Sequence, residues 1–154
     1  MTPEILEQLL SDENPTASVV DPNALIRCLL FPESIPGQAV RRAIAQEQLL
    51  VSEAIMWELA DVFARPKFNC YISLGNRQEF LRFLGRVAEL VEILRAVRAC
   101  RYPRDDKFLE LAVNGGADFI LTGDADLLAL HPFRTILILT PAEWLAGVEP
   151  DQEK

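Results

Sequence analysis

Short apolar segments alternate along this chain with stretches whose apolar residues recur at helical spacing, and this alternation limits the possible folds more than any other feature. Successive strands that are separated by helices run parallel, because antiparallel neighbours need only a tight turn between them. A parallel sheet is covered by helices on both faces, which agrees with strands that are apolar throughout. We therefore predict an α/β protein with three layers, α/β/α, around a central parallel sheet. The predicted strands are residues 17–20, 48–52, 89–94, 117–122 and 135–140.

The predicted helices separate nearly all of these strands, although residues 89–94 also fit a continuation of the helix before them. One domain is expected over residues 18–146. It follows an N-terminal extension, residues 1–17, with a short amphipathic helix at 3–10, and an acidic tail over residues 147–154 comes after it. The predicted helices within the domain are residues 24–30, 38–46, 53–66, 76–88, 106–114, 124–130 and 141–147.

The composition is that of a globular protein outside the membrane. No apolar run approaches the roughly 18 residues that span a bilayer, and the acidic N-terminus lacks the basic start of a signal peptide. Three widely spaced cysteines suit a reducing compartment, so we expect a cytoplasmic protein. The net charge of −8 argues against binding nucleic acid over the whole surface, but not against local binding.

Acidic residues fall near the ends of several predicted strands. Asp21 comes directly after the first strand, and Asp124 comes shortly after the fourth. Glu58 lies about a turn and a half into the helix after the second strand, and Asp105 and Asp106 open the helix before the fourth. Because ligands of open parallel sheets bind outside the carboxyl ends of the strands, we expect these carboxylates to meet at one edge of the sheet.

Such a cluster of like charges needs a cation. Two unit charges ~4 Å apart repel by roughly 4 kcal/mol at an effective dielectric constant of about 20. Carboxylates without cysteine or histidine suit a hard ion, Mg²⁺ or Mn²⁺, and these ions serve phosphoryl chemistry. The single histidine, His131, precedes a proline in a predicted loop, which disfavours a zinc site or a histidine base.

Each acid also has a purely structural interpretation. Asp21 before Pro22 is a good helix N-cap, and Asp124 or Asp126 can cap the short helix that follows. Asp105 and its neighbour stand in a first helical turn, where the helix dipole favours acids. The hypothesis of a site therefore depends on several acids reaching the same edge, and not on any one of them.

The chain resembles the PIN-domain family in four segments, and within it the toxin components of toxin–antitoxin systems. The segments are SVVDPNAL, LLVSEAIMWELADVFARPKF, PRDDKFLELAVNGGADFILTGDADLLAL and ILTPAEWL, which span about residues 18–145. The resemblance implies an α/β/α fold and hydrolysis of RNA phosphodiester bonds. One or two Mg²⁺ or Mn²⁺ ions would activate a water and stabilise the developing charge. It also implies a small antitoxin protein as partner and self-association.

The resemblance further implies the roles of individual residues. Asn23 and Thr122 match polar positions beside the first and the last acid of the family, and both are expected near the substrate. Asp124 is the preferred metal ligand of its segment, with Asp126 as the second choice. The catalytic acids implied by the motifs are Asp21, Glu58, Asp106, Asp124 and Asp126, and those implied as metal ligands are Asp21, Glu58, Asp106 and Asp124.

Arginines recur every three residues ahead of the paired acids, at Arg95, Arg98, Arg101 and Arg104. They could guide a phosphate backbone toward an acidic pocket, so the last three are predicted to bind substrate. The alternative is an ordinary solvated loop, and the sequence does not decide between the two.

Pro22 departs from the family pattern, in which a hydroxyl residue usually separates the aspartate from the asparagine. Proline removes both that hydroxyl and a backbone N–H. The alternative function is therefore a non-catalytic PIN-like domain that binds RNA or a protein. A third hypothesis takes Asp124 and Asp126 as a phosphatase-type nucleophile motif, which is disfavoured because such motifs normally follow the first strand.

Overall fold

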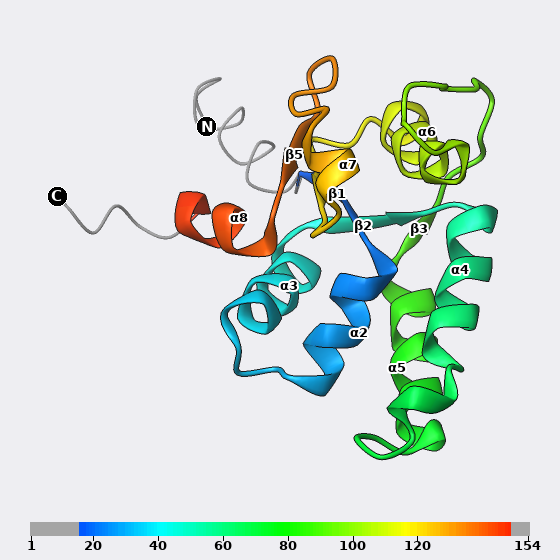
Figure 1. The fold of residues 1–154 in the computed structure, drawn as a ribbon, viewed down its shortest axis with the longest axis vertical. Coiled ribbons are helices and arrows are strands. Elements are labelled where there is room, and N and C mark those ends of the chain that lie inside the picture. Colours follow the sequence, from blue (N-terminus) through cyan, green and yellow to red (C-terminus); the bar gives the residue numbers. More distant parts are fainter. Residues whose placement is uncertain (1–15, 149–154) are drawn as a thin grey trace, which may run out of the picture.

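The computed structural model describes residues 16–148, so the predicted helix at 3–10 and most of the acidic tail lie outside the described residues. Within them the chain has the predicted three-layer α/β/α fold (Figure 1). Five parallel strands form one sheet in the order β3-β2-β1-β4-β5. The strands are β1 (Ala17–Val20), β2 (Gln48–Val51), β3 (Glu89–Leu90), β4 (Phe119–Leu121) and β5 (Leu137–Leu139).

Helices cover both faces of this sheet (Figure 1). On one face α6 contacts β1, β2 and β4. On the other, α2 packs between α3 and α4, and α8 lies beside α3. The helices are α2 (Pro22–Leu30), α3 (Ile35–Gln46), α4 (Glu53–Phe63), α5 (Leu74–Val87), α6 (Asp106–Gly115), α7 (Ala125–Leu128) and α8 (Pro141–Val148), with 3-10 turns η1 (Pro66–Phe68) and η2 (Pro103–Asp105). In the described residues no helix is long and apolar enough to cross a membrane.

The register of the two central strands sets the position of the acids. Val20 on β1 pairs with Leu121 on β4, so both strands end at the same level of the sheet. The backbone N–H of Asp21 donates to the carbonyl of Leu121 at 2.9 Å, which extends this pairing by one residue. Asp21 and Thr122, the next residue after each strand, therefore emerge side by side at the carboxyl edge.

Three helices begin earlier than predicted. Helix α2 starts at Pro22, α3 at Ile35 and α5 at Leu74, where the sequence predicted starts at residues 24, 38 and 76. The cause is capping, because the side chains of Asp21, Ser34 and Ser73 each accept a backbone N–H from the first turn.

The segment predicted as a strand at residues 89–94 is confirmed only over Glu89–Leu90. The backbone then leaves the sheet edge. The side chain of Asn114 on α6 accepts the N–H groups of Leu94 and Arg95 at 2.9 and 3.0 Å. These bonds replace the strand pairing that the apolar pattern suggested.

Candidate active site

Asp21 ends the central strand β1 and caps α2. Its Oδ1 accepts the backbone N–H of Asn23 at 2.9 Å, and its Oδ2 accepts the hydroxyl of Thr122 at 2.9 Å. Asp21 is only 6% exposed, and this burial raises the pKa of its carboxyl group. The charges of Glu58 and Asp124 raise the pKa further, whereas the two hydrogen bonds oppose the shift. Asp21 is thus a buried acid in an environment already rich in negative charge.

Thr122 links two of the predicted acids. It is fully buried, donates to Asp21 and accepts the backbone N–H of Asp124 at 3.0 Å. Asp124 in turn caps α7, where its Oδ1 accepts the N–H of Asp126 at 2.8 Å. The capping role predicted for one of these two acids therefore belongs to Asp124. Its second carboxylate oxygen is not needed for the cap.

Glu58 on α4 forms an ion pair across to α6. Its Oε1 lies 2.6 Å from Nζ of Lys107, and both side chains are partly buried. Lys107 also donates to the carbonyl oxygen of Arg104 at 2.9 Å. Lys107 was not predicted as a site residue, because a lysine next to two aspartates is typical of an ordinary solvated surface. In this structure it balances the charge of Glu58.

The paired acids before α6 have different surroundings. Asp106 accepts the backbone N–H groups of Ala99 and Cys100 on Oδ1, at 3.0 and 2.8 Å, and these bonds lower the pKa of Asp106. The pKa of Asp105 is instead raised, first by burial and then by the charge of Asp124. The motif assigned a metal ligand to Asp106, yet Asp105 is the acid of the pair that shares its negative environment with Asp124.

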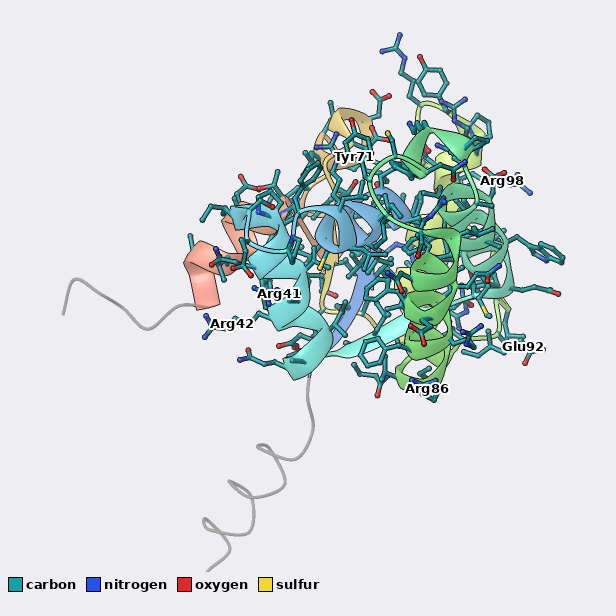
Figure 2. The ribbon with its side chains drawn as sticks, turned by 90° about the horizontal axis from the view of Figure 1, so that it is seen from below. Arg41, Arg42, Tyr71, Arg86, Glu92 and Arg98 are labelled. Carbon is teal, nitrogen blue, oxygen red and sulfur yellow. The ribbon has the colours of Figure 1, made fainter. Side chains whose placement is uncertain are left out.

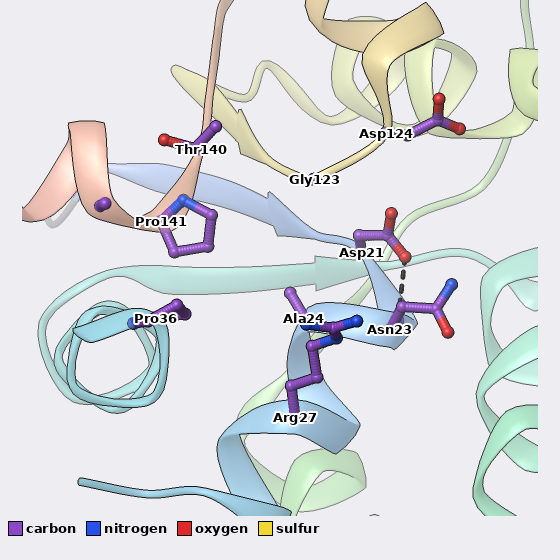
Figure 3. A pocket seen from close by; sticks show the side chains of 10 residues that line it. Asp21, Asn23, Ala24, Arg27, Pro36, Gly123, Asp124, Thr140 and Pro141 are labelled. Carbon is purple, nitrogen blue, oxygen red and sulfur yellow. Dashed lines mark hydrogen bonds between the residues drawn. The ribbon is translucent and has the colours of Figure 1, made fainter. Parts of the chain in front are cut away.

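A pocket of about 570 Å³ opens beside Asp21 and Asp124, between the start of α2 and the start of α8 (Figure 3). Asn23, predicted near the substrate, lies in its wall, as does Gly123. The wall also contains Arg27, one turn further along α2, which the sequence analysis did not single out. The spacing in the sequence could have indicated this position, because Arg27 follows Asn23 by four residues and therefore lies on the same face of the helix. The pocket thus combines carboxylates with a cation.

The arginines of the basic loop lie apart from this pocket. Arg101 and Arg104 both place their guanidinium groups over the ring of Tyr102, at 5.5 and 5.2 Å. The charge of Arg98 contributes to the lowered pKa of Asp106, although the hydrogen bonds contribute more. These arginines therefore border the acids from the side of α6 and do not line the pocket.

The side chains at this edge match the expected metal in the chemistry of their donor atoms. The residues that surround the edge offer carboxylate and hydroxyl oxygens, which suits Mg²⁺ or Mn²⁺. Across residues 16–148, however, no group of three or more Asp, Glu, His or Cys side chains is placed closely enough to hold a metal ion. The chemistry of the donors fits a hard cation, whereas a complete set of ligands is not assembled in this conformation.

Comparison with known proteins agrees with this arrangement. The model of the PIN domain family matches residues 17–126, which include β1, β4 and all five predicted catalytic acids. The chain is also similar to an uncharacterized protein, MJ1680, of Methanocaldococcus jannaschii. The two are 32% identical over 118 residues, which cover 73% of this chain and 74% of that protein. The match to the family model spans most of the chain and contains the acidic edge of its sheet, and the chain therefore belongs to the PIN-domain family.

Proposed function

We propose that this protein is a divalent-metal-dependent endoribonuclease that hydrolyses RNA phosphodiester bonds and acts as the toxin of a toxin–antitoxin pair. PIN domains are generally nucleases. The observation that carries the proposal is Asp21, a buried carboxylate at the end of the central strand whose pKa is raised by burial and by two further acids. A cation at this position would relieve the repulsion from Glu58 and Asp124, which adds to the effect of burial on that pKa.

The acids that would hold the ion are Asp21, Glu58 and Asp124, together with Asp106 or Asp105, while Asp126 is the second choice beside Asp124. Mg²⁺ keeps several waters and is often bound through one or two carboxylates. The incomplete ligand set of the described residues is compatible with binding of that kind. When bound, the ion would supply Lewis-acid stabilisation and an activated water.

The chain's own residues would orient this chemistry. The hydroxyl of Thr122 and the N–H of Asn23 fix both oxygens of Asp21. Arg27 lines the same pocket and carries a charge that suits a substrate phosphate. Arg98, Arg101 and Arg104 would bind the RNA backbone further from the reacting bond, on the α6 side.

Pro22 is the feature that supports the alternative, a non-catalytic domain that binds RNA or a protein. In the structure Pro22 is buried at the first position of α2, where a helix tolerates proline well. Asp21 still receives two hydrogen bonds there, so the missing N–H of Pro22 is not one that Asp21 needs. The missing hydroxyl remains the argument for the alternative, and restoring it with Pro22→Thr tests that argument.

Self-association and antitoxin binding would use other surfaces. Trp57 on α4 is 72% exposed and lies, with Met56 and Leu90, in the wall of an apolar groove of about 1070 Å³ between α4 and β3. Phe68, which follows α4 in η1, is less suited to such a contact because it is partly buried against the core. We propose Trp57 as the centre of the contact between copies of this chain.

The proposal is tested by cleavage of a mixed pool of structured and single-stranded RNA with Mg²⁺, with Mn²⁺ and with EDTA. We expect cleavage with metal that is abolished by EDTA and by Asp21→Asn. Asp105→Asn and Asp106→Asn, assayed in parallel, identify the acid of that pair which serves the metal. If the folded protein cleaves RNA with neither metal, the proposed nuclease activity is refuted. Activity gained only in Pro22→Thr would make the natural chain the non-catalytic alternative.

A further inference from the structure

Two exposed aromatic side chains meet at the far end of α2. Phe31 is 53% exposed and Tyr71 is 67% exposed, yet their rings contact each other edge to face, with centroids 6.4 Å apart. They come from different segments, the C-terminal end of α2 and the loop between η1 and α5. Figure 2 views this side of the molecule and shows Tyr71 close to α2. Most of the surface of both rings remains available to a ligand.

The loop that carries Tyr71 is held by a buried arginine. Arg77 on α5 is fully buried, and its guanidinium donates to the carbonyl oxygens of Phe63 and Arg65 at 2.9 and 3.1 Å. A further bond reaches Oδ1 of Asn69, two residues before Tyr71. A buried guanidinium that satisfies backbone carbonyls fixes the path of the loop. Tyr71 is thus presented on a rigid support.

Two cations lie near the pair along the chain. Arg27 precedes Phe31 by one helical turn, and Nζ of Lys67 lies over the ring of Phe68 in η1, close to Tyr71 in the chain. Arg27 also lines the acidic pocket, so it lies between the aromatic pair and the catalytic acids. The nine residues of α2 separate Asp21 from Phe31, which corresponds to about 15 Å at the helical rise. A few nucleotides of extended strand would span it.

We propose that Phe31 and Tyr71 form a stacking platform for the bases of single-stranded RNA, whose backbone passes Arg27 on its way to the acidic pocket. Bases of a single strand stack on exposed aromatic rings, whereas those of a duplex are stacked on each other and cannot. Arg27, on the helix between the rings and the pocket, carries a charge that suits the phosphate backbone. The inference rests on the proposed function and specifies its substrate as unpaired RNA that enters along α2.

The test measures binding without cleavage. Fluorescence anisotropy measures the binding of a short labelled oligouridine to the full chain in EDTA. The proteins compared are the natural protein and the variants Phe31→Leu, Tyr71→Leu and Tyr71→Phe. We expect affinity to fall at least about fivefold in each leucine variant, since a stacked base contributes substantially per ring. Tyr71→Phe keeps the ring and should bind like the natural protein. Phe83→Leu is the matched control, because Phe83 is also exposed, at 37%, but lies further along α5.

The outcomes separate this inference from the proposed function. The platform is supported if both leucine variants lose affinity for the oligouridine, Tyr71→Phe keeps it, and a duplex of the same sequence binds more weakly. This holds even if no RNA is cleaved. Unchanged RNA affinity in Phe31→Leu and Tyr71→Leu overturns it and would leave the pair as a contact for a protein. An equal loss of RNA affinity in Tyr71→Phe or in Phe83→Leu also overturns the platform, because the effect would then not come from stacking on these two rings. Circular dichroism confirms that each variant is folded.

Discussion

Replacing Thr122 with valine removes a hydroxyl that serves two acids at once. Valine keeps the shape of the fully buried side chain but loses the bond to Oδ2 of Asp21, at 2.9 Å, and the bond from the N–H of Asp124, at 3.0 Å. A hydrogen bond to a charged group contributes about 1.5–3 kcal/mol and a neutral one about 0.5–1.5 kcal/mol. We therefore expect Thr122→Val to lower the free energy of unfolding by about 2–4 kcal/mol.

Urea unfolding at two pH values measures this effect and its cause. The bond from Thr122 to Asp21 is charge-assisted only while Asp21 is ionised, so the destabilisation should be larger near neutral pH than near the raised pKa of Asp21. Thr122→Ser keeps the hydroxyl and loses one methyl group, at a cost of about 1 kcal/mol. A valine variant as stable as the natural protein, or a serine variant less stable than valine, would refute this reasoning.

Three further predictions concern other parts of the chain. Two N–H groups lower the pKa of Asp106 below its ordinary value of 3.8. Its contribution to the free energy of unfolding is therefore present above pH 3.8 and is lost as the pH falls through the lower pKa of the folded state. Between about pH 5 and pH 2, the natural protein should therefore lose more free energy of unfolding than the Asp106→Asn variant does. Arg77→Met leaves buried carbonyls unpaired and should lower the unfolding free energy by about 3 kcal/mol or more, against less than about 0.5 kcal/mol for the exposed Arg82→Met, both by urea unfolding. Trp57→Lys should leave the melting temperature within a few degrees while abolishing the proposed self-association in analytical ultracentrifugation, and a dimer that persists in this variant would remove Trp57 from the proposed contact.

The fold was predictable because the ends of its strands carry local chemical signals. Asp21 and Pro22 stop β1 and start a helix, and Ser52 does the same after β2, so hydrophobic runs and caps indicate the same boundaries. β3 shows where this fails. Its apolar pattern continues to Leu94, but the strand ends at Leu90, and Asn114, distant in sequence, accepts the N–H groups of Leu94 and Arg95. A tertiary contact of this kind leaves no local signal.

The position of the acids was predictable to the level of the sheet edge. Asp21 and Asp124 could be placed together because each follows one of two neighbouring strands, and parallel register then brings them to the same end. The orientation of adjacent side chains was not predictable. Whether Asp105 or Asp106 faces Asp124 depends on the η2 turn and on N–H groups in the preceding loop, and no spacing in the sequence encodes these. Lys107 was missed for the same reason, since its partner lies on another helix.

The proposed function depends on the binding of a divalent cation by the acids around Asp21. A titration with Mn²⁺, followed by electron paramagnetic resonance of the free ion, tests this binding without any RNA. Asp61→Asn is the matched control, because Asp61 shares α4 with Glu58 but is exposed and paired with Arg65. We predict that the natural protein and Asp61→Asn bind Mn²⁺ alike and that Asp21→Asn has lost this binding. A natural protein that binds no Mn²⁺, or an Asp21→Asn variant that binds it equally well, would contradict the claim.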